Sequence, residues 1–209
     1  AAMKHRVTVV DYGMCNMLNV ARAFQHLGAD PLITEDPADV GRAEMLVVPG
    51  VGAFEDSIRE VVSRGFADAI CRFSESGRPM LGICVGMQIL FEASEEFGLH
   101  KGLGILRGRV KAIPSIATDG TPLRVPHIGW NHLVPPESGR TWGDTVLAPL
   151  THVNPAVYFV HSFAGDVARD AAETVLAETT HGRPFTSAIA RRNVLGVQVP
   201  EVALDPQVG

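Results

Sequence analysis

The 209-residue chain has no excess of basic residues and no long apolar run. Its 18 lysines and arginines against 23 acidic residues give a formal net charge of −5 with neutral histidines. Without a basic excess, a chain lacks the electrostatic footprint of a nucleic-acid binder. The most apolar stretch, residues 80–90, contains Gln88 and is well short of the roughly 20 residues that cross a bilayer. We therefore expect neither a nucleic acid nor a membrane as a partner.

Cysteines are few and are not spaced as metal ligands. The chain has three, Cys15, Cys71 and Cys84, in no Cys-x-x-Cys or Cys/His pattern. The first residues show no apolar segment followed by a small-residue cleavage site, so no secretory signal is expected. These features favour free thiols in a reducing cytoplasm, and they predict neither a cofactor nor a metal ion.

Apolar periodicity predicts an α/β fold. Short apolar runs that are each followed by helical spacing occur at residues 7–10, 45–48 and 80–83. The helices are expected at residues 16–27, 54–69 and 87–93. This alternation is typical of parallel strands joined by crossover helices. After Gly104, shorter β-like runs split by prolines suggest antiparallel strands. We expect one domain over residues 1–209, with an open, mostly parallel central sheet flanked by helices and antiparallel strands added in the C-terminal half.

A candidate nucleophile lies where the third strand meets its helix. The run Gly82-Ile83-Cys84-Val85-Gly86 places glycines on both sides of a thiol, which permits the cramped turn that exposes a nucleophile at the edge of a sheet. The positive end of the following helix favours the thiolate form. The alternative is that Cys84 is a small buried residue at a tight turn. The flanking strand and helix favour catalysis.

A second glycine-rich turn, Pro49-Gly50-Val51-Gly52, also follows an apolar strand. Ligands of open α/β sheets bind at the carboxyl ends of the strands, where this turn could offer main-chain N–H donors to an oxyanion together with the N–H of Val85. An ordinary turn is the alternative. The turn is not a phosphate loop, because it lacks the Gly-Lys-Ser/Thr ending.

A cysteine nucleophile needs a base, and no histidine is convincing from its spacing alone. Of the eight histidines, His161 is the best placed, since it directly follows the apolar run at residues 158–160. A structural role at a strand end is the more common one for such a residue. His161 and His181 are the candidates from the late part of the chain.

Several motifs resemble a known family. The run from Gly82 to Gln88 resembles the nucleophile motif of class I (triad) glutamine amidotransferases, and the turn at residues 49–52 resembles their oxyanion strand. Three further motifs resemble the glutaminase subunit of imidazole glycerol phosphate synthase: Asp11-Tyr12-Gly13-x-x-Asn16, Val125-Pro126-His127-Ile128-Gly129-Trp130-Asn131 and Tyr158-Phe159-Val160-His161-Ser162. The similarity extends from about residue 7 to residue 198.

The resemblance implies that Cys84 attacks the carboxamide of glutamine, forming a thioester and releasing ammonia. It implies an oxyanion hole lined by Gly50, Val51, Gly52 and Val85. It also implies that glutamine is held by Gln88, Ser162 and Phe163. The implied partner is a separate (β/α)₈ synthase (cyclase) subunit that receives the ammonia and makes imidazole glycerol phosphate in histidine biosynthesis. Trp130 and Asn131 match positions near the interface of that heterodimer.

The chain departs from this family at two places. Cys15 stands where the family has glycine, a mild change. After Gln198 the family continues Phe-His-Pro-Glu-Lys-Ser, with the histidine as general base and the glutamate as its orienting partner, whereas this chain reads Val199-Pro200-Glu201. Glu201 matches the orienting glutamate only if one residue is dropped. A glutamate with a pKa near 4.3 is a weak proton acceptor from a thiol, so we expect glutaminase activity to be weakened by at least the factor of about 10²–10⁴ that acid–base catalysis contributes.

The sequence leaves three alternatives open. The chain could supply ammonia to a different synthase, such as a sugar amidotransferase. It could be a glutaminase-deficient subunit that docks on a synthase without making ammonia, as the missing histidine suggests. It could also be a cysteine hydrolase of the α/β type, which would act on esters or lactones without a partner.

Overall fold

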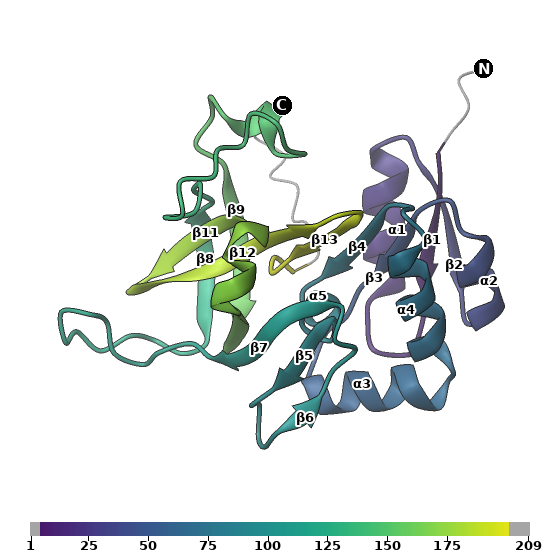
Figure 1. Cartoon of the computed structure of the whole chain (residues 1–209), viewed down its shortest axis with the longest axis horizontal. Helices are drawn as coiled ribbons and strands as arrows, with labels where there is room; N and C mark the ends of the chain where they lie inside the picture. Colours follow the sequence, from purple (N-terminus) through teal and green to yellow (C-terminus); the bar gives the residue numbers. More distant parts are fainter. Residues whose placement is uncertain (1–4, 201–209) are drawn as a thin grey trace.

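A seven-stranded sheet forms the centre of the computed structural model, which describes residues 5–200 (Figure 1). Its strand order is β11-β12-β13-β4-β3-β1-β2. The strands are β1 (Arg6–Val10), β2 (Asp30–Thr34), β3 (Leu46–Val48), β4 (Met80–Ile83), β11 (Val175–His181), β12 (Arg183–Arg191) and β13 (Val194–Val197). The pairings from β2 to β13 are parallel, while β12 and β11 add antiparallel strands at one edge. The predicted α/β architecture is confirmed.

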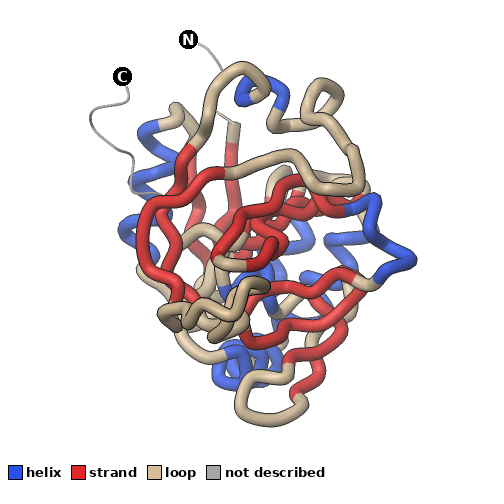
Figure 2. The backbone as a smooth tube through the Cα atoms, turned by 90° about the vertical axis from the view of Figure 1, so that its left-hand side faces the viewer, coloured by secondary structure: helices blue, strands red, loops and turns tan. Residues whose placement is uncertain are grey.

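Helices cover the two faces of the parallel strands. They are α1 (Met17–His26), α2 (Pro37–Arg42), α3 (Phe54–Ser63), α4 (Phe66–Glu75) and the short α5 (Val85–Gln88). Successive residues of β3 point to opposite faces, so that Val48 packs in the cluster formed with α2 to α4 and Val47 packs in the cluster formed with α1. Figure 2 shows strands through the middle of the molecule and most helices toward its periphery.

Two helix predictions are wrong in their bounds. The helix expected over residues 54–69 is divided into α3 and α4, because Gly65 adopts a left-handed conformation (φ 79°) between them. The helix expected over residues 87–93 ends at Gln88, and residues 91–94 form strand β5 instead. The predicted helix after residue 16 is confirmed as α1, with the Asn16 side chain capping its first turn.

The remaining strands form two smaller sheets. One has the order β10-β7-β5-β6, with β5 (Phe91–Ser94), β6 (His100–Lys101), β7 (Leu106–Ala112) and β10 (Phe163–Val167). The other is a two-stranded antiparallel ribbon of β8 (His127–His132) and β9 (Ala156–His161). Two 3₁₀ helices, η1 (Ala148–Leu150) and η2 (Arg169–Thr174), complete the described elements. No described helix combines the length and apolarity that a membrane span requires.

Candidate active site

Cys84 lies at the carboxyl end of β4, directly before α5, as the sequence predicts. Its backbone (φ 54°, ψ −119°) lies outside the regions that non-glycine residues favour, at a cost on the order of 1–3 kcal/mol. Hydrogen bonds fix the turn on both sides. The Cys84 N–H donates to the carbonyl of Val197 (2.8 Å), and the Cys84 carbonyl accepts from the N–H groups of Met87 and Gln88. The residue is 8% exposed, so the thiol sits close beneath the surface.

Glycines let the turn at residues 49–52, which we call the glycine turn, pack closely against the strand-to-helix turn at Cys84, which we call the elbow. A Cβ atom at Gly86 would collide with the carbonyl oxygen of Val48, and one at Gly50 would collide with the Tyr12 hydroxyl and with the Gly86 nitrogen. Both positions therefore require glycine for close backbone approach rather than for flexibility. The two glycine-rich turns singled out in the sequence meet in space.

Two of the N–H groups predicted to line an oxyanion hole, those of Val51 and Val85, are bonded inside the protein in this conformation. The Val85 N–H donates to the Gly50 carbonyl (3.3 Å), and the Val51 N–H donates to the Met14 carbonyl (2.8 Å). Gly52, at the end of the turn, has a left-handed backbone (φ 90°). These two donors thus lie beside the nucleophile but are directed to other acceptors.

Two of the residues predicted to hold glutamine are in direct contact. The buried Gln88 side chain donates from Nε2 to the Phe163 carbonyl (3.1 Å), at the start of β10. Ser162 connects β9 to β10, and its carbonyl accepts from the Ile113 N–H (2.9 Å). The turn at residues 162–163 and the elbow helix α5 therefore adjoin.

The sequence reasoning missed two residues at this site. Gln198 is fully buried, and its Nε2 lies 3.9 Å from the Cys84 sulfur while its Oε1 accepts from Gln88 (3.0 Å). The parallel pairing of β13 with β4 brings it there, a signal that the strand pattern contained. The fully buried Tyr12 donates its hydroxyl to the Pro49 carbonyl (2.6 Å), which fixes the glycine turn. Burial raises the pKa of Tyr12 strongly, so the phenol stays protonated as this donor.

The late histidines are engaged elsewhere. His161 contacts His127 through Nε2 (3.1 Å) and the Phe163 carbonyl through Nδ1 (2.9 Å), so both ring nitrogens are occupied. His181 contacts the Arg124 carbonyl (2.8 Å). His161, the histidine favoured by its place in the sequence, is therefore not arranged as a base for Cys84. Glu201 lies outside the described residues.

An apolar face runs along the β8–β9 ribbon, where Trp130 was predicted to meet a partner. Trp130 is 52% exposed and stacks edge-on with Tyr158, and Ile128 and Val160 are exposed directly across the ribbon from each other. Asn131, on the same strand, donates to the Thr180 carbonyl (2.9 Å) and thereby ties the ribbon to β11. We refer to Ile128, Trp130, Tyr158 and Val160 as the ribbon face.

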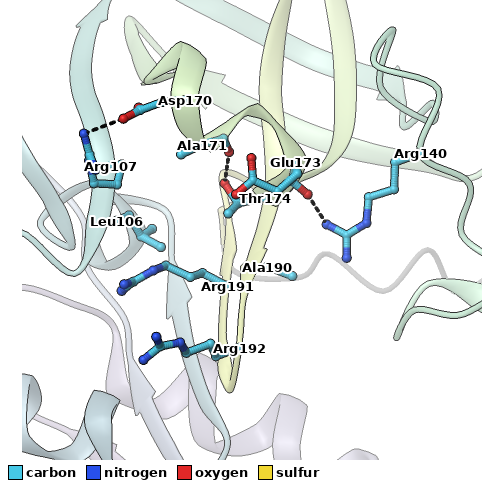
Figure 3. A pocket seen from close by; sticks show the side chains of 10 residues that line it. All are labelled: Leu106, Arg107, Arg140, Asp170, Ala171, Glu173, Thr174, Ala190, Arg191 and Arg192. Carbon is cyan, nitrogen blue, oxygen red and sulfur yellow. Dashed lines mark hydrogen bonds and ion pairs between the residues drawn. The ribbon is translucent and has the colours of Figure 1, made fainter.

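A cavity of about 480 Å³ lies at the other end of β13 and is separate from this site (Figure 3). Arg191 and Arg192 line it just before β13 begins, whereas Cys84 bonds to the residue at which β13 ends. Arg107 pairs with Asp170 (2.9 Å) in its wall. The cavity carries none of the predicted site residues.

Replacing Cys84 by glycine should give a more stable protein than replacing it by alanine. Glycine elsewhere is usually the less stable choice by about 0.5–1 kcal/mol, but here it relieves the unfavourable φ of 54°. We expect Cys84→Gly to exceed Cys84→Ala by about 1 kcal/mol in free energy of unfolding, measured by urea denaturation. A lower stability of the glycine variant would mean that the elbow is not strained.

Comparison with known proteins agrees with this geometry. Residues 8–208 match the family model described as glutamine amidotransferase class-I. The chain is 42% identical over 193 residues to the imidazole glycerol phosphate synthase subunit HisH 1 of Legionella pneumophila (strain Lens), covering 92% of this chain and 89% of that protein. It is 41% identical over 198 residues to the HisH subunit of Syntrophotalea carbinolica, with 92% and 90% covered.

Solved structures share the fold at low sequence identity. A crystal structure of a glutamine amidotransferase superposes with a TM-score of 0.66 at 16% identity, over 92% of this chain and 88% of that one. PurLQS from Thermotoga maritima gives a TM-score of 0.63 at 21% identity, over 93% and 86%. From its elbow cysteine, its adjoining glycine turn and these matches, the chain belongs to the class I glutamine amidotransferase family.

Proposed function

We propose that this protein is the glutaminase subunit of an imidazole glycerol phosphate synthase, acting in the cytoplasm in histidine biosynthesis. The observation that carries the proposal is the strained elbow of Cys84 packed against the glycine turn, in a chain about 40% identical to HisH subunits over nine-tenths of its length. The family model that matches, over residues 8–208, is that of the class-I glutamine amidotransferases, and this favours the glutaminase over the ester-hydrolase alternative.

The reaction follows from the position of the sulfur. The Cys84 thiolate attacks the carboxamide carbon of glutamine, and the carbonyl oxygen takes up the negative charge. The C–N bond then breaks as the nitrogen gains a proton and leaves as ammonia. Water hydrolyses the resulting thioester, releasing glutamate and the free thiol. Gln88 and the turn at Ser162–Phe163 hold the substrate.

The oxyanion is stabilised by main-chain donors of the glycine turn, from Gly50 to Gly52, and by Val85. Since the Val51 and Val85 N–H groups donate to internal carbonyls, at least one peptide plane of the turn rotates before it faces the substrate. The peptide plane that carries the Val51 N–H lies between Gly50 and Val51, and the conformational freedom of Gly50 on one side of it eases such a rotation. Loss of one oxyanion donor typically costs about 10²–10³ in rate.

The proton-transfer step is the weak point of this chain. Gln198 contacts the sulfur, but an amide does not take up a proton at neutral pH. Glu201 is the carboxylate that follows in sequence, and we propose that it acts with reduced efficiency in place of a histidine–glutamate pair. The second candidate function, a docking subunit with little glutaminase activity, is favoured by this same feature.

The partner is a (β/α)₈ synthase subunit that receives the ammonia. The ribbon face supports this assignment, since contiguous exposed aromatic and aliphatic side chains mark protein interfaces. Trp130 and Asn131 are the interface residues, with Trp130 as the anchor.

Replacing Trp130 by aspartate should weaken binding of the synthase subunit by at least about 30-fold, because aromatic anchors dominate interface energies. The measurement is titration calorimetry with the purified synthase. Leu27→Asp is the matched control, since Leu27 is also apolar and exposed but lies at the end of α1. Equal affinity of the two variants would remove Trp130 from the interface.

Covalent labelling tests the proposed function directly. A glutamine-mimicking diazoketone, incubated with the complex of this chain and its synthase, should add to Cys84 and to neither Cys15 nor Cys71, as located by peptide mass spectrometry. Excess glutamine should protect the thiol, and Cys84→Ala should abolish the adduct. An unlabelled Cys84 in the intact complex would reject the glutaminase assignment. Labelling combined with undetectable glutamine turnover would instead support the docking subunit.

A further inference from the structure

We propose that His161 is a positioning residue for the glutamine site, held in one tautomer by a one-way chain of hydrogen bonds that starts at Asn131. This inference rests on the proposed function. It adds a role for two buried histidines, His127 and His161, that the chemistry at Cys84 does not use directly.

The contacts of Asn131, at which the hydrogen-bond chain starts, fix the direction of donation. The Oδ1 atom of Asn131 accepts from the His132 N–H (2.8 Å), and its Nδ2 donates to the Thr180 carbonyl (2.9 Å), so the orientation of the amide is set. Nδ2 also faces the Nε2 atom of His127 at 3.4 Å. Since Nδ2 can only donate, Nε2 of His127 must accept, and the ring carries its proton on Nδ1.

The contact between His161 and Phe163, at the other end of the hydrogen-bond chain, independently requires the same tautomers. The Phe163 carbonyl can only accept, so Nδ1 of His161, at 2.9 Å, must carry a proton. In the neutral ring Nε2 is then an acceptor, and the Nδ1–H of His127 donates to it at 3.1 Å. The two ends thus require the same tautomer of each histidine, with every donor pointing from Asn131 toward Phe163.

The hydrogen-bond chain ends at the Phe163 carbonyl, which orients Gln88. The Phe163 oxygen accepts from both His161 and Gln88, so both of its lone pairs are used. The two hydrogens of Gln88 Nε2 go to Phe163 and to Gln198, which contacts the Cys84 sulfur. The orientation of the Gln88 amide is therefore fixed, and its Oε1 is the atom that it can offer to a substrate N–H. Without the His161 donor, the Phe163 carbonyl loses one of the two bonds that fix it.

The surroundings keep both rings neutral. His127 packs between the rings of His181 (4.2 Å) and Phe159 (5.2 Å), and Phe185 lies against His161. Burial lowers the pKa of His127 to about 4, with smaller contributions from the facing His181 and His161, and burial also lowers the pKa of His161. A proton added to His161 would go to Nε2 and face the Nδ1–H of His127, whereas one added to His127 would go to Nε2 and face the N–H of the Asn131 amide. With a pKa of about 4, His127 should stay neutral from pH 8 to about 5, and the hydrogen bonds that it makes should fail as the pH approaches 4.

The experiment measures diazoketone inactivation of the synthase complex, separating the binding constant KI from the rate constant kinact. Loss of one hydrogen bond should raise KI of His161→Phe and His161→Gln about 3–10-fold, with kinact changed less. His161→Asn places an N–H where Nδ1 stood and should restore KI to within about 2-fold of the wild-type value. His132→Asn, on the exposed end of β8, is the control and should leave KI unchanged.

Two further measurements use the wild-type complex and therefore do not depend on how the variants fold. Imidazole ¹⁵N NMR at pH 7 should show His127 and His161 both protonated at Nδ1, and KI should stay flat from pH 8 to 5. An Nε2–H tautomer of either ring, a rise in KI through pH 6.5, or equal KI for all His161 variants would overturn the proposal while leaving the glutaminase assignment intact. Failure of the wild-type complex to label would instead overturn the proposed function, and this inference with it.

Discussion

Insertion of a histidine between Val199 and Pro200 should raise the rate of glutamine hydrolysis by about 10²–10⁴-fold in the synthase complex. The inserted chain reads Gln-Val-His-Pro-Glu, in which the imidazole precedes the proline and Glu201 follows it. An imidazole with a pKa near 6.5 exchanges protons with a thiol and a leaving amine at neutral pH far better than a carboxylate with a pKa near 4.3. The Gln198 amide lies 3.9 Å from the sulfur, so the insertion point is two residues after a residue that contacts the nucleophile.

The matched control is insertion of alanine at the same place, which changes the spacing without adding a base. Steady-state release of glutamate measures both variants and the parent. Equal rates for the two insertions would mean that the missing imidazole does not limit this protein. A parent rate already as high as that of the histidine insertion would remove the argument for impaired proton transfer.

Replacement of Gly86 by alanine should destabilise the protein by about 3 kcal/mol or more. The new methyl group would collide with the backbone of Val48 and Pro49, which cannot rotate away as a side chain could. Because β3 and β4 are neighbouring central strands, the strain would fall on the core rather than on a loop. Urea denaturation of the purified variant, or its loss from the folded fraction on expression, measures the effect.

Gly41→Ala provides the contrast. Gly41 lies in α2, and a Cβ atom there would meet no other group within 4 Å. Alanine loses less conformational entropy on folding than glycine in a helix, so we expect a gain of about 0.5–1 kcal/mol. If both variants lost stability alike, close backbone approach would not explain the requirement for glycine at position 86.

The sequence predicted the parallel core well because its local signals agree with one another. The apolar runs at residues 7–10 and 80–83 became central strands, and the glycines around Cys84 marked the strand-to-helix turn. These features depend on a few adjacent residues. Their local preferences are not overridden by distant contacts.

Features set by long-range contacts were not predictable in the same way. Residues 91–94 carry an apolar pattern compatible with a helix, but pairing with β7 and β6 makes them a strand. The contact of Gln198 with Cys84 depends on the pairing of β13 with β4, across more than a hundred residues. Similarly, the engagement of His161 Nε2 depends on His127, in a motif that the sequence linked to the family resemblance and to the partner interface but not to the site.

The internally bonded amides of Val51 and Val85 have a consequence for metabolic economy. The bonds from Val51 to Met14 and from Val85 to Gly50 are each worth about 0.5–1.5 kcal/mol, so turning both N–H groups toward a substrate costs about 1–3 kcal/mol. On its own, the protein would adopt the turned arrangement for only about one part in five to one part in 160 of the time, since 1.4 kcal/mol is about a tenfold change. Idle consumption of cellular glutamine would be held down by that factor until another molecule stabilises the turned form.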